Sequence, residues 1–308
     1  MSPFLIRRLP TLQSGSLVDS KSFPPNTVFL NPSAAGDFTY LRAIRYEKID
    51  QMNYALIHDT KRNVTHTINS PMDMLKPTAN MFKGIEDLRI VQFKDRLWFT
   101  ATSTHASHAM NSEMVLGYFD KALTRVERMS TIDAGPLPVK NVCPFVYGDG
   151  SGADGSLRLI DTWRRVIYEV EEVFTEPTGT FERFALKKVA NFTAASGIPD
   201  EGLRGSTSPI HLHGNTWGFV VHDMIVNDSS GPLVNRLSYF HHWVEMDMAR
   251  NMITYFSSPF WIQHWGIEYV SGIKYLDREK GLVELYYGIQ DQVPAKCITR
   301  LCNLRIGK

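Results

Sequence analysis

Several polar residues in this sequence stand directly before runs of β-branched and aromatic residues, where strands are expected. Asp87 and Arg89 belong to the most polar of these motifs, and they place a carboxyl group and a guanidinium two positions apart, where they could bind polar groups of a ligand or pair with each other. Asn31 and Asn141 carry amides, which hydrogen-bond hydroxyl groups. Such residue types suit a ligand rich in hydroxyl groups, provided that the fold gathers them.

The segments that must position these residues are short β-rich runs such as FTYLRAIRY, RLWFTATS and LVELYYGI, while helical periodicity is scarce. A polar motif, a β run, a turn and a second β run recur five times. The motifs lie near residues 31, 86, 141, 204 and 268, which are 55 to 64 positions apart. This interval fits one four-stranded blade with its loops. We therefore predict an all-β, five-bladed β-propeller that forms a single domain over residues 1–308.

In a propeller, the innermost strand of each blade lines a central channel, so polar residues at the starts of these strands meet in one funnel. A concave site with many directional polar groups suits a polyhydroxylated sugar. The residues expected to converge there are Asn31, Glu86, Asp87, Arg89, Lys140, Asn141, Arg204, Glu268 and Asp291.

Five motifs, in order along nearly the whole chain, resemble glycoside hydrolase family 130 and the related β-mannoside phosphorylases and β-1,2-mannosyltransferases. They are FLNPSA with YLRAIRY, GIEDLRIVQFKDRLWFTATS, VKNVCPF, RGSTSPIHLHGNTWGFVVHD, and SGIKY with LVELYYGIQDQVPA. The chain departs from the family pattern at one position, where Leu88 replaces the proline of Glu-Asp-Pro-Arg. The acidic and basic residues on either side are kept.

The resemblance implies that Asp87 is the general acid, acting through a substrate hydroxyl, and that phosphate is the nucleophile. Inorganic phosphate or a sugar phosphate is then the expected co-substrate, and it needs several basic groups around the anomeric carbon. The candidate phosphate ligands are Arg45, Lys140, Arg204 and His222, and the candidate sugar ligands are Asn31, Arg89, Asn141, Asp291, Arg236 and Tyr239.

The leading hypothesis is an enzyme that transfers a glycosyl group, in particular mannosyl, by phosphorolysis or from a sugar phosphate. One alternative on the same fold is a nucleotide-sugar-dependent glycosyltransferase or a glycoside hydrolase. Hydrolysis by two or three carboxylates is disfavoured, because Asn31 and Lys140-Asn141 stand where fructosidases and arabinanases, also five-bladed, would offer acids. The other alternative is a carbohydrate-binding propeller without catalytic activity.

The composition bears on possible nucleic-acid binding, membrane insertion and cellular compartment. A formal net charge of +1, from 33 basic and 32 acidic residues, does not suggest a nucleic-acid partner. No apolar run approaches the roughly 20 residues of a membrane-spanning helix. Three cysteines without zinc-motif spacing fit a reducing compartment, so we expect a cytoplasmic protein. We expect an oligosaccharide or sugar-phosphate partner and neither a metal nor an organic cofactor. A homo-oligomer is compatible with the resemblance.

Overall fold

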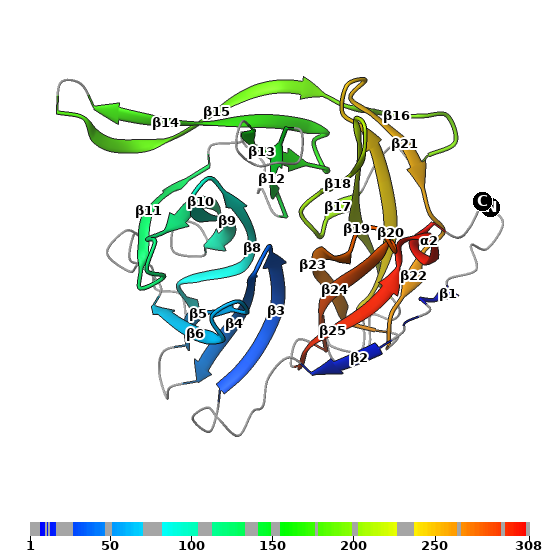
Figure 1. The fold of residues 1–308 in the computed structure, drawn as a ribbon, viewed down its shortest axis with the longest axis horizontal. Helices are drawn as coiled ribbons and strands as arrows, with labels where there is room; N and C mark the ends of the chain where they lie inside the picture. The colour runs from blue at the N-terminus through cyan, green and yellow to red at the C-terminus, as the bar shows by residue number, and fades with distance from the viewer. Residues whose placement is uncertain are drawn as a thin grey trace.

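The described residues fold almost entirely into β-strands, with one short helix among them, α2 (Leu301–Leu304). In this computed structural model, the described strands form five sheets that stand around a common centre (Figure 1). This propeller-like arrangement confirms the predicted all-β class. The structure describes residues 7–9, 11, 13–16, 27–46, 51–69, 82–103, 113–132, 141–148, 155–175, 178–198, 203–226, 237–263, 266–290 and 293–305.

The first two sheets are built from consecutive strands. Sheet 1 contains β3 (Thr27–Ala35), β4 (Phe38–Tyr46), β5 (Gln51–Asp59) and β6 (Val64–Asn69), with β7 (Phe82–Lys83) paired parallel to β5. Sheet 2 contains β8 (Ile85–Phe93), β9 (Arg96–Ser103), β10 (Glu113–Phe119) and β11 (Val126–Thr131). In both sheets the first long strand lies nearest the centre of the ring (Figure 1).

Sheet 3 contains an unusually long hairpin. Its strands are β12 (Cys143–Tyr147), β13 (Ser156–Asp161), β14 (Val166–Thr175) and β15 (Thr180–Asn191). The hairpin of β14 and β15 extends well beyond the ring (Figure 1). The part of the hairpin nearer its turn packs on sheet 2, where Phe184, which pairs with Glu172, contacts Trp98 and Tyr118.

Sheet 4 has the most strands. Its inner edge is β17 (Arg204–Gly205) followed by β18 (Ile210–His213), and both pair with β19 (Thr216–Val226). The other strands are β20 (Leu237–Asp247), β21 (Met252–Phe256), β22 (Phe260–Trp261), β16 (Thr193–Ala194) and β1 (Arg7–Arg8).

Sheet 5 joins segments that are far apart in the sequence. It contains β23 (Glu268–Asp277), β24 (Leu282–Ile289) and β25 (Val293–Arg300), and β2 (Gln13–Ser16) forms its outer edge. Gln13 pairs with Ile298 in this ladder. The ring is thus closed by backbone hydrogen bonds between an early and a late strand.

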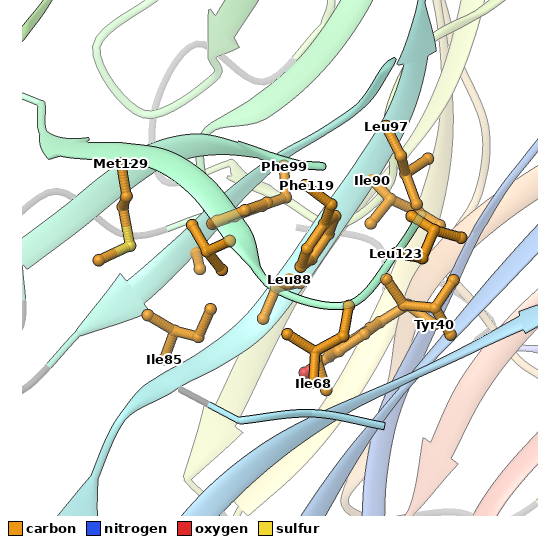
Figure 2. Close-up of a cluster of buried hydrophobic side chains, with 14 of the residues drawn as sticks. Tyr40, Ile68, Ile85, Leu88, Ile90, Leu97, Phe99, Phe119, Leu123 and Met129 are labelled. Atoms are coloured by element: carbon orange, nitrogen blue, oxygen red, sulfur yellow. The ribbon is translucent and has the colours of Figure 1, made fainter. Parts of the chain in front are cut away.

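The cores lie between neighbouring sheets, which explains the nearly continuous apolar strands. In β9, Leu97 and Phe99 face the cluster between sheets 1 and 2, whereas Trp98 faces the cluster between sheets 2 and 3. Alternate side chains of a strand point to opposite faces, so both faces must be apolar here. Figure 2 shows the first cluster, in which Leu88 is fully buried close to Tyr40.

Candidate active site

The inner strands share a local irregularity near the motifs singled out in the sequence. A register shift interrupts β3 between Leu30 and Ser33, and another interrupts β8 between Glu86 and Arg89. One residue in each bulge, Asn31 and Asp87, and Asn141, two residues before β12, have left-handed backbone conformations. The φ angles are 39° at Asn31, 56° at Asp87 and 64° at Asn141. Asn and Asp adopt this conformation more readily than other residues with side chains, which accounts for their use here.

Asp87 is held by groups from sheet 1. Its Oδ1 accepts a 2.5 Å hydrogen bond from Asn31 Nδ2 and a 3.2 Å hydrogen bond from Arg42 Nη1. Within the described residues, Oδ2 has no hydrogen-bond partner, and 28% of the side chain is exposed. Burial raises the pKa of Asp87, but the charges of Arg42 and Arg89 and the two hydrogen bonds outweigh it, so the pKa lies below its usual range. Asp87 is therefore a carboxylate at neutral pH.

Arg42 is a site residue that the sequence analysis did not identify. Its guanidinium is buried and bridges two acids, with Nη2 2.9 Å from Glu86 Oε2 and Nη1 3.2 Å from Asp87 Oδ1. Nε donates to Asn53 Oδ1 at 2.8 Å, which fixes the plane of the group. The sequence of β4 could have identified Arg42. Side chains of a strand point alternately to its two faces, so Arg42 shares a face with the core residue Tyr40. A charge on a core-facing position implies a buried partner.

Arg89 connects the sheets around the axis. Its Nη1 donates to the carbonyl of Asp87, Nε donates to the carbonyl of Ser206 at 3.3 Å, and Nη2 donates to Asn141 Oδ1 at 3.0 Å. Its guanidinium also lies over the ring of Tyr269, 5.3 Å from the centroid. Only 1% of Arg89 is exposed. The described contacts of Arg89 are all with other parts of the protein, and its role as a sugar ligand stays a prediction.

Asn141 shares that network. Its Oδ1 accepts a second hydrogen bond from the hydroxyl of Tyr269 at 3.0 Å. Gly205 of sheet 4 packs against the carbonyl of Asn141 so closely that an added Cβ would lie 2.4 Å from that oxygen. The amide oxygen of Asn141 is thus committed to the protein. Residues of sheets 2, 3, 4 and 5 meet at this point.

His222, a candidate phosphate ligand, is a buried and neutral histidine. Burial lowers its pKa well below the usual value, and the nearby charges of His241, Arg89 and Arg204 lower it further. The neutral ring lies 2.8 Å from Ser206 Oγ through Nδ1. It packs edge-on against two tyrosines, with centroid distances of 5.5 Å to Tyr239 and 5.0 Å to Tyr269. His222 therefore packs against Tyr239 and Tyr269 and helps to fix the positions of their rings.

Arg204 lies at the rim beside an exposed aromatic residue. Its guanidinium is 5.6 Å from the centroid of Trp163, which is 52% exposed. Trp163 belongs to the turn after β13, which lies at the same end of sheet 3 as Asn141 because β12 and β13 are antiparallel. The turn is braced by Asp161, whose carboxylate accepts a 3.0 Å hydrogen bond from the backbone of Arg164.

Glu268, another acid of the predicted funnel, is hydrogen-bonded to backbone N–H groups. Glu268 is fully buried, and its two oxygens accept hydrogen bonds of 2.5 Å from Ile262 N and 2.8 Å from Gln263 N. Glu86 is paired with Arg42. Among the described members of the predicted funnel, Asp87 is therefore the acid with a carboxylate oxygen free of protein partners.

Several predicted ligands cannot be placed relative to this site. Lys140, Arg236 and Asp291 lie outside the described residues, as does the side chain of Arg45. In the part of the chain that is described, no three His, Cys, Asp or Glu side chains group closely enough to hold a metal ion. That part also contains no helix with the length and apolar character needed to span a membrane.

Known proteins resemble this chain in structure but not in sequence. No protein-family profile matches it, and no curated protein matches it. A mannose phosphorylase from Leishmania mexicana, solved with a phosphate ion, is 13% identical with a TM-score of 0.56, over 95% of this chain and 89% of that one. A GDP-Man-dependent mannosyltransferase from the same organism is 13% identical with a TM-score of 0.54, over 97% and 92%.

A glycosyl hydrolase from Bacteroides ovatus is 10% identical, with a TM-score of 0.52 over 90% of this chain and 85% of that chain. At sequence identities of 10% to 13%, the structural similarity shows a shared fold. The resemblance to mannoside phosphorylases that the motifs predicted is confirmed at that level, over nearly the whole chain.

Proposed function

We propose that this protein is a carbohydrate-active enzyme that transfers a glycosyl group, in particular mannosyl, with Asp87 as its general acid. In this proposal, each of the five sheets is one blade of a propeller, and the substrate enters along the axis. One observation carries the proposal. Asp87 is a partly exposed carboxylate at the centre of the ring, with one oxygen held by Asn31 and Arg42 and the other free of partners among the described residues.

The reaction follows from this asymmetry. Protonated Asp87 gives its proton, through a sugar hydroxyl, to the oxygen that leaves the anomeric carbon. The bond between that carbon and the leaving oxygen breaks as a phosphate oxygen forms the new bond. The products are a glycosyl phosphate and a free sugar, and Asp87 is left as a carboxylate. A single carboxylic acid suffices because phosphate replaces the second carboxylate of a hydrolase.

The low pKa of Asp87 has a consequence for the order of events. In the free site the group is a carboxylate, so it cannot act as an acid until its pKa rises. A phosphate ion bound nearby would raise the pKa, because a like charge disfavours the ionised form. We therefore propose that phosphate arrives first and brings the proton that Asp87 later donates.

Arg204 is the described residue best suited to hold this phosphate, because it is charged, partly exposed and close to the axial network. The L. mexicana phosphorylase of the same fold was solved with a phosphate ion, which supports an anion as co-substrate. The fold is shared equally with a GDP-Man-dependent mannosyltransferase. A nucleotide sugar is therefore the second candidate donor.

The test is phosphate release from mannose 1-phosphate in the presence of mannose as acceptor, with GDP-mannose assayed in parallel. We expect Asp87→Asn to lose at least a hundredfold in kcat, within the usual range for a general acid. The matched control is Asp95→Asn, at an exposed turn at the other end of the inner strands. Full activity in Asp87→Asn would exclude the assigned role. Sugar binding that survives in both variants without product would favour a binding protein.

A further inference from the structure

A second cavity lies at the opposite end of the inner strands. It has a volume of about 350 Å³ and is lined by residues of all five sheets, among them Gly36, Gln92, Val146, Ile210 and Ile273. In β8, the lining residue nearest the acid of the candidate active site is Ile90, three residues after Asp87, which corresponds to about 10 Å along a strand. None of Asn31, Arg42, Asp87, Arg89 and Asn141 lines this cavity, so it is distinct from the candidate active site, and its volume is typical of small-molecule sites.

The lining of this cavity combines apolar walls with positive charge. Ile90, Ile210, Ile273 and Tyr275 form much of the wall, and Lys274 and Arg278 contribute the charges. None of the described residues that line it carries a carboxylate. An apolar cavity with a few convergent polar groups is the usual form of a ligand site.

Arg278 is oriented by neutral groups. Its Nη2 donates to the carbonyl of Leu212 at 3.0 Å and to His211 Nδ1 at 2.9 Å. His211 Nε2 lies 2.8 Å from the carbonyl of Gly214, and a carbonyl only accepts, so Nε2 carries the proton and Nδ1 is the acceptor. The ring of Tyr275 packs against the guanidinium at 5.4 Å. The charge of Arg278 is thus positioned without being neutralised.

The remaining donors of Arg278 are available. In the described part of the chain, no acid lies within ion-pair distance of Arg278, and neither Nε nor Nη1 has a hydrogen-bond partner. Nε and Nη1 do not share an edge of the guanidinium, so each can donate one charge-assisted hydrogen bond to an oxygen of a carboxylate or phosphate.

Lys274 adds to the positive potential. Its Nζ lies 3.6 Å from Glu284 Oε2, but Glu284 also pairs with Lys296 at 2.8 Å. Two ammonium groups therefore share one carboxylate, and this trio keeps a net positive charge beside the cavity.

We propose that this cavity binds a small organic anion, in which a phosphate or carboxylate group meets Arg278 and an apolar group fills the space between Ile90, Ile210 and Ile273. The site is independent of the reaction proposed at Asp87. Because the lining residue Ile90 belongs to β8, the strand that carries Asp87 and Arg89, a ligand here contacts an element of the candidate active site.

The experiment is calorimetric titration of the protein with phenyl phosphate and with benzoate, which carry the two anionic groups on the same apolar ring. We expect both to bind, to compete with each other, and to bind at least tenfold more tightly than inorganic phosphate. Benzyl alcohol, which lacks the charge, should not bind. The absence of binding by both anions at millimolar concentration would overturn the proposal.

Variants locate the binding. Arg278→Gln should weaken phenyl phosphate at least tenfold, and Lys274→Gln should weaken it less. Arg250→Gln, at a solvent-exposed ion pair, is the matched control and should have no effect. Arg204→Gln at the candidate active site should also have no effect on this affinity. Unchanged affinity in Arg278→Gln, with thermal melting showing a folded protein, would overturn the assignment, as would loss of binding in Arg204→Gln alone.

Discussion

Asn31 and Asp87, which lie 56 positions apart in the sequence, share a 2.5 Å hydrogen bond between the side-chain amide and the carboxylate. Both residues have positive φ angles inside bulges of neighbouring inner strands. The bond fixes one carboxylate oxygen and leaves the other without a partner among the described residues. The reactivity proposed for Asp87 therefore depends on contact between two sheets, and the following predictions test that dependence.

Arg42→Met should shift the pH dependence of the proposed reaction. Arg42 is the main charge that lowers the pKa of Asp87, so its removal raises that pKa. An acid with a higher pKa stays protonated to higher pH, so the fall in rate on the basic side of the pH–rate profile should occur at a higher pH. The measurement is kcat against pH. Arg62→Met, at an exposed ion pair, is the control, and identical profiles for Arg42→Met and the parent would contradict the prediction.

Arg89→Met should destabilise the whole ring. The change leaves the carbonyls of Asp87 and Ser206 without the donors of Arg89, whereas Asn141 Oδ1 keeps its hydrogen bond from Tyr269. An unsatisfied buried acceptor costs about 1–3 kcal/mol, so we expect a loss of about 3 kcal/mol or more in the free energy of unfolding. Urea denaturation measures it. The exposed Arg250→Met should change stability by less than about 0.5 kcal/mol, and an equally small effect for Arg89→Met would refute the structural role.

The free energy of unfolding should fall as the pH is lowered from 7 to 5. Burial lowers the pKa of His241 to about 3 and of His242 to about 4, and that of His222 well below 6.5. The unfolded chain binds these protons near pH 6.5 and the folded chain does not, so acid favours unfolding. Each histidine contributes up to about 1.4 kcal/mol per pH unit in this range.

Urea midpoints at several pH values measure this slope. His242→Gln should reduce it by up to one histidine's share, whereas His58→Gln, at an exposed hydrogen bond, should leave it unchanged. A midpoint that stays constant between pH 5 and pH 7 would show that the buried histidines are not neutral.

Trp163→Ala should weaken binding of the sugar acceptor. One face of the indole is covered by Arg204 and the ring is half exposed at the rim, so it offers an amphipathic surface on which a sugar can pack. We expect KM to rise about fivefold with little change in kcat, the signature of uniform binding. Phe174→Ala, on the projecting hairpin, is the control. An unchanged KM would place the sugar elsewhere.

The sequence predicted the arrangement of strands better than the roles of single residues. Polar motifs, turn residues and β-rich runs are local signals, and they correctly indicated an all-β fold with Asn31, Asp87 and Asn141 near the starts or bulges of inner strands. Burial is a property of the assembled ring. The inaccessibility of Arg89 and the neutral state of His222 follow from sheets that pack over them.

Arg42 shows the limit most clearly. Its core-facing position in β4 could be derived from strand alternation, but its partners, Glu86 and Asp87, belong to the next sheet. Leu88 is the converse case. It stands where the resembled family has proline, and it is fully buried in the cluster between sheets 1 and 2 (Figure 2).

The pairing of β2 with β25 has a kinetic consequence. Residues 13–16 meet residues 295–298, a contact that spans most of the chain. Such distant contacts slow folding, because the chain loses the entropy of closing a long loop before these contacts can stabilise the fold. During synthesis, the outer edge of sheet 5 stays incomplete until residue 298 has left the ribosome. Until then the emerging protein carries an unsatisfied strand edge, which is the moment at which it is most exposed to aggregation.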